Sequence, residues 1–379
     1  MTHHTTRTGP LRSGAAVVGV ATAHSGSPVL ARWDAKAMGW PRPRPLLIVI
    51  ALLIGAVFPV IAPDRSWLSV ATLAMITLTL AQSWNLVLGY GGVWNFGQLA
   101  FYALGAYSAA LVTIYLPVPV WLSIPIAGVV SGGIALLLSI PILRLRGIYV
   151  SLLTFGFAEV VRLLIVADQS GVTGGSYGLS GFPGFGFTGP GALSLNYWIG
   201  FAAAVVTTLI VFVLVRSPLG NGMIAMRDNP ALASARGVGQ QTYQMLVFAI
   251  SGFLAGVAGA LYAHVFAVAS PTLMGLSPMT LIVTMLVVGG LGTVTGPIIG
   301  TLLLSFVQMQ LQDLPEIRLA ALGVVLLVVI LTMPRGLLPF FSAQWAKLEA
   351  WMAEDDEDDE DAPDAAGAAG AAGAAGATR

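Results

Sequence analysis

Long stretches of apolar residues, separated by polar connections, recur through the middle of the chain. A helix needs about 20 predominantly apolar residues to cross the hydrocarbon core of a bilayer, and most of these stretches are close to that length. The pattern predicts an all-α, polytopic integral membrane protein with about ten transmembrane helices. The predicted spans are Leu46–Ala62, Trp67–Leu88, Val93–Tyr115, Val120–Leu143, Ile148–Ala167, Ser194–Val215, Tyr243–Ala269, Pro278–Leu291, Gly296–Leu311 and Ile317–Met333.

The cations between the spans predict the orientation of the chain. Lys and Arg concentrate in the cytoplasmic loops of membrane proteins. Pro278–Leu291 is short enough to be a re-entrant segment, but that reading would move the C-terminal cations outside, so we expect a full crossing and cytoplasmic N- and C-termini. Ten spans then leave only Arg65 and Arg318 outside, each near an acid, and place on the cytoplasmic side Arg144, Arg146, Arg216, Arg227, Arg236, Arg335 and Lys347.

Composition divides the chain into three parts. Residues 1–45 form a basic arm that we expect to be disordered, and residues 46–340 form the transmembrane domain. Residues 341–379 contain eight consecutive acids followed by Ala-Ala-Gly repeats. Such a tail buries too little to fold, so we expect it to be disordered, with docking to a basic partner as the alternative. Two long connections inside the domain are candidates for function: external residues 168–193 and cytoplasmic residues 216–242.

The composition excludes several functions. Of the 379 residues, 56% are hydrophobic and only 9% are charged, too few charges to cover a soluble protein. There is no cysteine, and the only lysines, Lys36 and Lys347, do not follow a glycine, so the chain lacks a phosphate-binding P-loop. We expect no catalytic residue, cofactor, metal or nucleic-acid partner. If ATP drives transport, a separate polypeptide must bind it.

One pair of charges lies within a predicted span. Glu159 and Arg162 are three residues apart on Ile148–Ala167, which places them on one face of a helix. Charges in a membrane are costly and often functional. The pair predicts either an ion couple that anchors the helix near its outer end, which we favour, or a site for a proton or a substrate carboxylate.

A glycine-rich segment joins the second and third spans. It contains Asn85, Gly89, Gly91, Gly92, Asn95 and Gln98. Broken helices expose backbone dipoles, and helix N-termini favour carboxylates. These six residues are therefore candidates for a translocation path. The alternative is a tight interhelical turn whose amides cap the helix ends.

Other glycines recur four residues apart. Small residues at this spacing let helix backbones approach closely. We expect most of them to serve packing within the chain, with a subunit interface as the alternative for some. The pairs are Gly128/Gly132, Gly252/Gly256, Gly292/Gly296 and Gly296/Gly300.

The polar connection after the sixth span contains a short helix signal. Asp228 or Asn229 can cap a helix that begins at Pro230, because proline suits the first helical position. Residues 231–236 favour helix, and Gly237 can end it. The expected product is a short helix with a basic, otherwise small-residue surface, which suits docking into a groove of another protein.

Several motifs in order resemble the membrane subunits of branched-chain amino acid ABC importers, the LivM-type permeases. Together they extend from the second predicted span to Leu338, and several motifs in register are more specific than any one alone. The motifs are Asn85-Leu-Val-Leu-Gly89-Tyr-Gly91-Gly92, Leu99–Tyr107, Arg144-Leu-Arg146-Gly147-Ile-Tyr149, Thr173–Leu179, Ser217–Val238, Ala258–His264, Val288–Pro297 and Pro334-Arg335-Gly336-Leu337.

The resemblance implies a location in the bacterial cytoplasmic membrane and a set of partners. These are a second homologous permease subunit, two ABC ATPase subunits that bind ATP, and an extracytoplasmic substrate-binding protein. It also implies that the cytoplasmic connection holds the coupling helix that seats in an ATPase groove, although Pro230 stands where many members have an acid. The coupling residues would be Arg227, Asp228, Ala231, Ala233, Ala235 and Gly237.

The substrate class follows from the same resemblance. We expect branched-chain or other small amino acids, with urea or short amides as the alternative, since related permeases share these motifs. Two functions of other classes remain open at this point: a proton-coupled secondary carrier that uses Glu159, and a membrane scaffold without transport.

Overall fold

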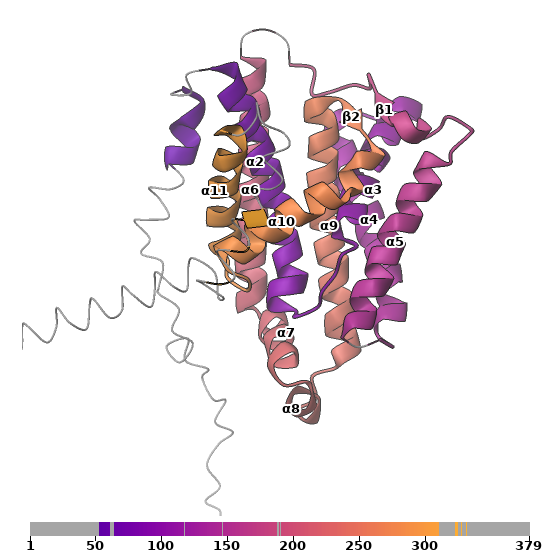
Figure 1. The fold of residues 1–379 in the computed structure, drawn as a ribbon, viewed down its shortest axis with the longest axis vertical. Coiled ribbons are helices and arrows are strands. Elements are labelled where there is room, and N and C mark those ends of the chain that lie inside the picture. The colour runs from indigo at the N-terminus through magenta and orange to yellow at the C-terminus, as the bar shows by residue number, and fades with distance from the viewer. Residues whose placement is uncertain are drawn as a thin grey trace, which may run out of the picture. The chain divides into compact units, whose positions relative to one another are not determined.

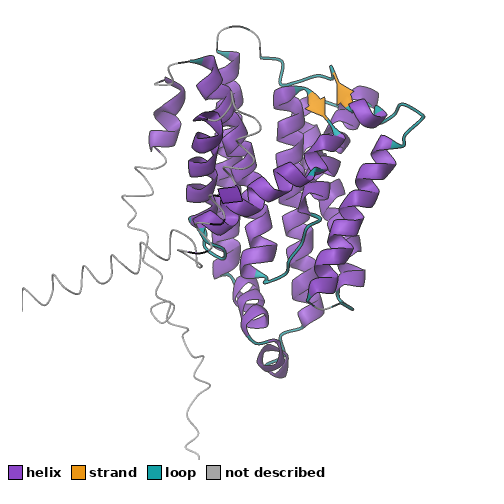
Figure 2. Cartoon of the chain, in the orientation of Figure 1, coloured by secondary structure: helices purple, strands orange, loops and turns teal. Residues whose placement is uncertain are grey.

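The computed structural model describes residues 53–60, 64–116, 118–145, 147–187, 189, 191–310, 323, 324, 327 and 331, all of which lie in one compact unit, Pro45–Arg379. The described part is mostly helical (Figures 1 and 2). Six helical stretches are long and apolar enough to cross a membrane. They are α2 with η2 (Arg65–Asn85 and Leu86–Tyr90), α3 (Gln98–Tyr115), α4 (Val120–Ile142), α5 (Ile148–Val166), α6 (Ala192–Arg216) and α9 (Gln240–Phe266).

The remaining elements are short. Two helices, α7 and α8, lie between α6 and α9, and two more, α10 and α11, follow α9 (Figure 1). Two single turns, a two-stranded antiparallel ladder and a helical stretch over residues 53–60 are also described. The bounds are α7 Pro218–Asp228, α8 Pro230–Ala235, α10 Leu276–Gly289, α11 Gly296–Gln310, η3 Gly175–Tyr177, η4 Pro271–Met274, β1 Leu179–Ser180 and β2 Val268–Ala269.

Six of the ten predicted spans are long helices in the structure. The predicted spans Pro278–Leu291 and Gly296–Leu311 correspond to α10, which has 14 residues, and to α11, whose described part ends at Gln310. At about 1.5 Å per residue, α10 is shorter than the roughly 30 Å hydrocarbon core, and it runs obliquely to the long helices (Figure 1). Full crossings by these two helices, and therefore ten spans in all, stay a prediction.

Other predictions fall outside the described residues. The span Leu46–Ala62 is described only at residues 53–60, which are helical, the span Ile317–Met333 only at residues 323, 324, 327 and 331, and the arm and the acidic tail are not described. The sidedness predicted for the two termini therefore stays a prediction.

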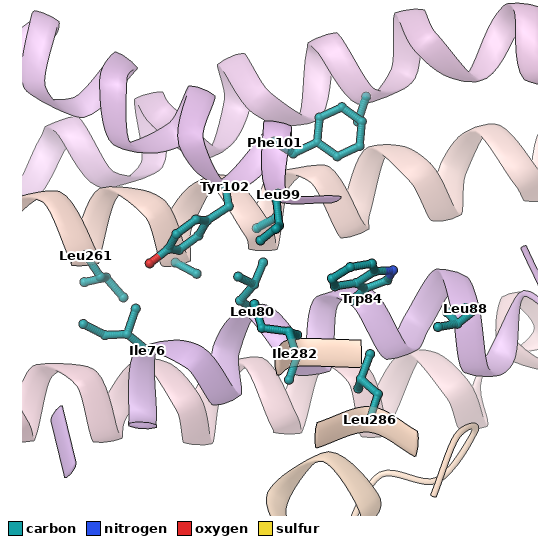
Figure 3. Close-up of a cluster of buried hydrophobic side chains, with 14 residues drawn as sticks. Ile76, Leu80, Trp84, Leu88, Leu99, Phe101, Tyr102, Leu261, Ile282 and Leu286 are labelled. Atoms are coloured by element: carbon teal, nitrogen blue, oxygen red, sulfur yellow. The ribbon is translucent and has the colours of Figure 1, made fainter. Parts of the chain in front are cut away.

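Helix α9 is central to the packing. It packs against α3 and α4 and also against α2, which in turn packs against α6 and α11. Figure 3 shows the main apolar cluster, in which Trp84 of α2, Phe101 of α3 and Leu286 of α10 are fully buried. Lipid is as apolar as these side chains, so close packing rather than exclusion of water holds membrane helices together.

Glycines make this close packing possible between α4 and α9. A Cβ atom added to Gly256 would lie 2.6 Å from the Ser131 Cβ atom, and one added to Gly132 would lie 3.0 Å from a backbone oxygen of α9. Gly128 and Gly252 also face the opposite helix at van der Waals contact or closer. For these two glycine pairs, the predicted role in packing within the chain is confirmed.

The two long connections lie at opposite ends of the helices. In residues 168–193, β1 pairs with β2, which directly follows α9, and the Pro183 carbonyl lies 2.9 Å from Nδ1 of His264. Helices α7 and α8, from residues 216–242, lie at the other end (Figure 1). The fold therefore has one end built from the α5–α6 connection and another built from α7 and α8.

Asp168 organises the start of the α5–α6 connection. Its Oδ1 accepts hydrogen bonds from the amide and hydroxyl of Ser170, and its Oδ2 accepts them from the Thr173 amide at 2.6 Å and the Thr173 hydroxyl at 2.7 Å. These donors hold the pKa of the Asp168 carboxyl well below its usual range, because they stabilise the charged form. The Ser170 hydroxyl has the largest effect. The connection is thus anchored by an ionised aspartate at neutral pH.

Candidate functional site

Helix α2 ends in a π-helical turn instead of a simple break. The Gly91 amide donates to the Leu86 carbonyl at 3.0 Å, and the Val93 amide donates to the Val87 carbonyl at 3.0 Å. Gly92 then adopts φ +67°, a conformation that favours glycine. π-turns are rare and often occur at functional sites. Here the turn carries the chain out of α2 and toward α3.

Asn85 joins α2 to the connection between α10 and α11. Its buried Nδ2 donates to the Thr293 carbonyl at 2.8 Å, and its Oδ1 accepts from the Gly292 amide at 3.0 Å. One turn earlier, Nε2 of Gln82 donates to the Val294 carbonyl at 2.8 Å. Two amide side chains of α2 therefore hold three successive residues of a segment more than 200 positions away.

Asn95 and Gln98 belong to a second buried network. Asn95 Nδ2 donates to Gln98 Oε1 at 3.0 Å, and Gln98 Nε2 lies within hydrogen-bond distance of the hydroxyls of Ser83 and Ser251. Gln98 is fully buried and Asn95 is 1% exposed. The amides of these two residues connect α2, α3 and α9, so in this conformation they bond to the chain itself.

The polar connection after α6 folds into two capped helices. Asn229 caps α8: its Oδ1 accepts from the Leu232 amide at 3.0 Å, and Pro230 is the first helical residue, as one of the two predicted arrangements requires. Helix α7, which we did not predict, has the same signal, with Ser217 as the cap and Pro218 at the first position. Serine followed by proline could have identified it from the sequence.

Helix α8 presents an apolar side chain to the outside of the chain. Ala231 and Ala235 are exposed, whereas Ala233 is 4% exposed and faces inward. Leu232 is 52% exposed. Gly237 follows the helix with φ +83°, and the Val238 amide donates to the Ala233 carbonyl at 3.1 Å, so the helix ends here as predicted. The outward surface of α8 is thus centred on a leucine that the small-residue interpretation of the sequence overlooked.

Arg227 points back toward the transmembrane helices. Its Nη1 donates to the Gly89 carbonyl at 2.8 Å, and its Nε donates to Oδ1 of Asp228 at 2.9 Å. A Cβ atom added to Gly92 would lie 3.2 Å from the Arg227 Cβ and Cδ atoms, and nearer still to Cγ, so the glycine makes room for the arginine. Arg227 therefore binds both Asp228 and the π-turn.

A cleft of about 630 Å³ brings the two predicted sites together. Gly91, Gly92 and Trp94 contribute one wall, and residues of α7 and α8 contribute another. The start of α9 and the α4–α5 connection complete the lining. The glycine turn predicted to line a path and the helix predicted to couple to a partner therefore border the same space. Among the described residues, no group of three His, Cys, Asp or Glu side chains could hold a metal.

Glu159 and Arg162 form an ion pair on α5. Arg162 Nε donates to Glu159 Oε2 at 3.0 Å, and the guanidinium makes a further contact through Nη2. Their side chains are 42% and 34% exposed, respectively. Neither residue lines the cleft, although Val150 of the same helix does. Its role as an anchor or as a proton or carboxylate site stays a prediction.

Comparison with known proteins gives a consistent family. The family model described as "Branched-chain amino acid transport system / permease component" matches residues 66–333. The high-affinity branched-chain amino acid transport system permease protein LivM of Escherichia coli K12 is 29% identical over 323 residues, which cover 79% of this chain and 76% of the relative. LivM of Salmonella typhimurium LT2 is 29% identical over 335 residues, covering 82% and 78%.

A more distant relative has a different named solute. The ribose import permease protein RbsC of Haemophilus influenzae is 26% identical over 239 residues, which cover 60% of this chain and 72% of the relative. No solved structure matches the chain. With a family match over most of the chain and six apolar helices long enough to span a membrane, the chain belongs to the branched-chain amino acid transport permeases, the non-catalytic ABC-transporter membrane components of the bacterial cytoplasmic membrane.

Proposed function

We propose that this chain is the permease subunit of an ABC importer that carries branched-chain or other small amino acids across the cytoplasmic membrane. ATP is hydrolysed on two partner ATPase subunits, because the chain itself has no P-loop. A second homologous permease subunit and an extracytoplasmic binding protein complete the transporter. The family match and the two LivM relatives support this assignment.

The observation that carries the proposal is the outward surface of α8. A capped helix of six residues extends beyond the long helices and exposes Leu232, with Ala231 and Ala235 beside it. Burying a whole leucine side chain contributes about 1.5–3 kcal/mol, so covering the exposed half contributes roughly 1 kcal/mol. Such a surface suits a hydrophobic groove on an ATPase subunit, with Leu232 as its central contact.

The glycine turn is our candidate for part of the translocation path. Gly91 and Gly92 border the cleft, whereas the side chains of Asn85, Asn95 and Gln98 are bonded within the chain. We therefore propose that the backbone of Gly91 and Gly92, rather than the amide side chains, faces the solute near the α7–α8 end, whereas Gly89 is buried and bonded to Arg227. The amides then hold the segment in place.

The relatives support an amino-acid substrate. The two LivM relatives match about four fifths of the chain, whereas the ribose permease matches 60% of it. Urea or a short amide is the alternative solute. Proton coupling through Glu159 has less support, because the Glu159 carboxylate is already paired with Arg162.

Reconstitution tests the proposal. The chain, its second permease and its ATPase subunits are placed in proteoliposomes with the binding protein outside and ATP inside. Uptake of radiolabelled leucine, isoleucine and valine is compared with uptake of urea and ribose. A matched preparation carries ATPase subunits whose P-loop lysine is replaced by alanine.

We expect ATP-dependent uptake of at least one branched-chain amino acid, and none with the P-loop variant. Uptake of urea alone would change the substrate and keep the mechanism. Uptake that continues with the P-loop variant and follows a proton gradient would contradict the proposed mechanism.

A further inference from the structure

We infer that Arg227 is a positioning residue that transmits movement of the α7–α8 connection to the glycine turns inside the permease. The inference rests on the proposed function, because it assumes that an ATPase moves α8. It goes further by naming the residue through which that movement reaches the membrane helices.

The first link is the hydrogen bond between Arg227 and the π-turn. The Gly89 carbonyl accepts from Arg227 Nη1 at 2.8 Å across 138 positions of sequence. Carbonyls in the last turn of a helix lack the following amides and need another donor, and a guanidinium is a strong one. Asp228 holds the guanidinium from the other side through Nε. The orientation of Arg227 is therefore set from both sides.

The second link passes from the π-turn to the α10–α11 connection. A Cβ atom added to Gly89 would lie 2.9 Å from the Cα atom of Gly292 and closer to its nitrogen, so the two backbones are in direct contact. Asn85 binds Gly292 and Thr293, and Gln82 binds Val294. A displacement of Gly89 must therefore be shared by the segment that joins α10 and α11.

These links place one guanidinium where three segments meet. Arg227 belongs to α7, Gly89 to the end of α2, and Gly292 to the α10–α11 connection. A Cβ atom added to Gly292 would itself lie 3.2 Å from Arg227 Nη1. Packed backbones of this kind move together, because there is no space in which one could move alone.

Contacts other than those of Arg227 also hold α7 in place. Met223 is 3% exposed, and Gly222 packs directly against the Tyr243 ring of α9. Ser217 caps the first turn of α7. Replacing Arg227 should therefore leave α7 and α8 folded and able to bind an ATPase, while it removes the contact with Gly89.

The experiment uses the complete transporter in proteoliposomes and three variants. Arg227→Gln removes the charge, and Arg227→Lys keeps a charged donor without the planar fork. Arg144→Gln is the matched control: it removes an exposed arginine of the α4–α5 connection, at the same end of the helices. Assembly is measured by copurification of the ATPase. ATP hydrolysis is measured with and without leucine-loaded binding protein, and transport is measured as uptake of radiolabelled leucine.

We expect Arg227→Gln to assemble and to keep its basal hydrolysis. The stimulation by loaded binding protein and the leucine uptake should fall by about tenfold, within the usual range of coupling between sites. Arg227→Lys should be intermediate, and Arg144→Gln should match the wild type.

Three results would overturn the inference. The first is uptake by an assembled Arg227→Gln complex equal to that of Arg144→Gln. The second is a loss of basal and stimulated ATP hydrolysis in the same proportion. The third is loss of assembly in both Arg227 variants. Either of these two would show that Arg227 acts in docking or folding rather than in transmitting movement. A wild-type complex without substrate-stimulated hydrolysis would overturn the proposed function, and the inference with it.

Discussion

The contact between Gly89 and Gly292 predicts a specific response to one added methyl group. In Gly89→Ala the new Cβ atom would overlap the Gly292 nitrogen and the Asn85 Oδ1 atom, and would lie 2.9 Å from the Gly292 Cα atom. Two of these three atoms belong to the backbone, which cannot rotate away as a flexible side chain can. The substitution must therefore separate α2 from the α10–α11 connection.

The magnitude follows from three contributions. Overpacking of a filled site costs about 1–3 kcal/mol, and loss of the hydrogen bond between Asn85 and the Gly292 amide costs about 1 kcal/mol. Alanine is better than glycine within a helix by about 0.5–1 kcal/mol, which offsets part of the loss. The expected net decrease in the free energy of unfolding is roughly 1–3.5 kcal/mol.

Thermal unfolding in detergent, followed by tryptophan fluorescence, measures this effect. Gly133→Ala in α4 is the matched control, because a Cβ atom there would meet no described atom within 4 Å. The control should be as stable as the wild type or more stable by up to about 1 kcal/mol. A Gly89→Ala protein that unfolds at the same temperature as the Gly133→Ala protein would refute the packing argument.

The structure makes three further predictions. Gln98→Ala should destabilise the protein by about 2 kcal/mol, since it removes bonds to Ser83, Ser251 and Asn95 from a buried site, whereas exposed Gln169→Ala should have no effect in the same unfolding assay. Asp168→Asn should speed hydrogen exchange in residues 168–175. In the wild type, the ionised Asp168 carboxylate stabilises this connection, and its pKa is lower in the folded protein than the ordinary value of about 4. The stabilisation is therefore complete above about pH 4 and is lost only as the pH falls toward the lower, folded-state pKa. Exchange protection should not change between about pH 8 and 5. Glu159→Gln should leave ATP-dependent leucine uptake unchanged if, as we favour, the Glu159 carboxylate serves only to pair with Arg162.

Each of these predictions has a contrary result. Equal stability of the Gln98 and Gln169 variants would show that the buried network contributes nothing. Protection of the α5–α6 connection that already declines between about pH 7 and 6 would contradict the lowered pKa, because the ordinary value is about 4. Abolished uptake in Glu159→Gln would support the proton-coupled alternative.

Local sequence patterns predicted what depends on local chemistry. Long apolar stretches identified six helices, because length and composition alone decide whether a helix can cross a membrane. The Asn229–Pro230 pair marked the start of α8, because a cap acts on residues next to it. The same rule applied to Ser217 and Pro218 would have identified α7. The family followed from motifs in order, and the comparisons confirm it.

Contacts between distant segments were beyond the reach of the sequence. Asn85 and Arg227 are both polar residues near helix ends, and nothing beside them indicates that one binds Gly292 and the other Gly89. The short length of α10 was visible in the sequence as the short apolar stretch Pro278–Leu291, but its oblique course was not, because that depends on how it packs (Figure 1). Leu232 received no attention among alanines, since its exposure depends on how α8 packs against the rest of the chain.

The central claim is that an ATPase subunit contacts α8 at Leu232. The chain has no native cysteine, so Leu232→Cys can carry a single thiol-linked photocrosslinker. Tyr177→Cys is the control, because Tyr177 is 96% exposed in the α5–α6 connection, at the opposite end of the helices. The account predicts that the assembled transporter yields a crosslink to the ATPase from position 232 and none from position 177. An intact complex in which position 232 does not crosslink to the ATPase would contradict it.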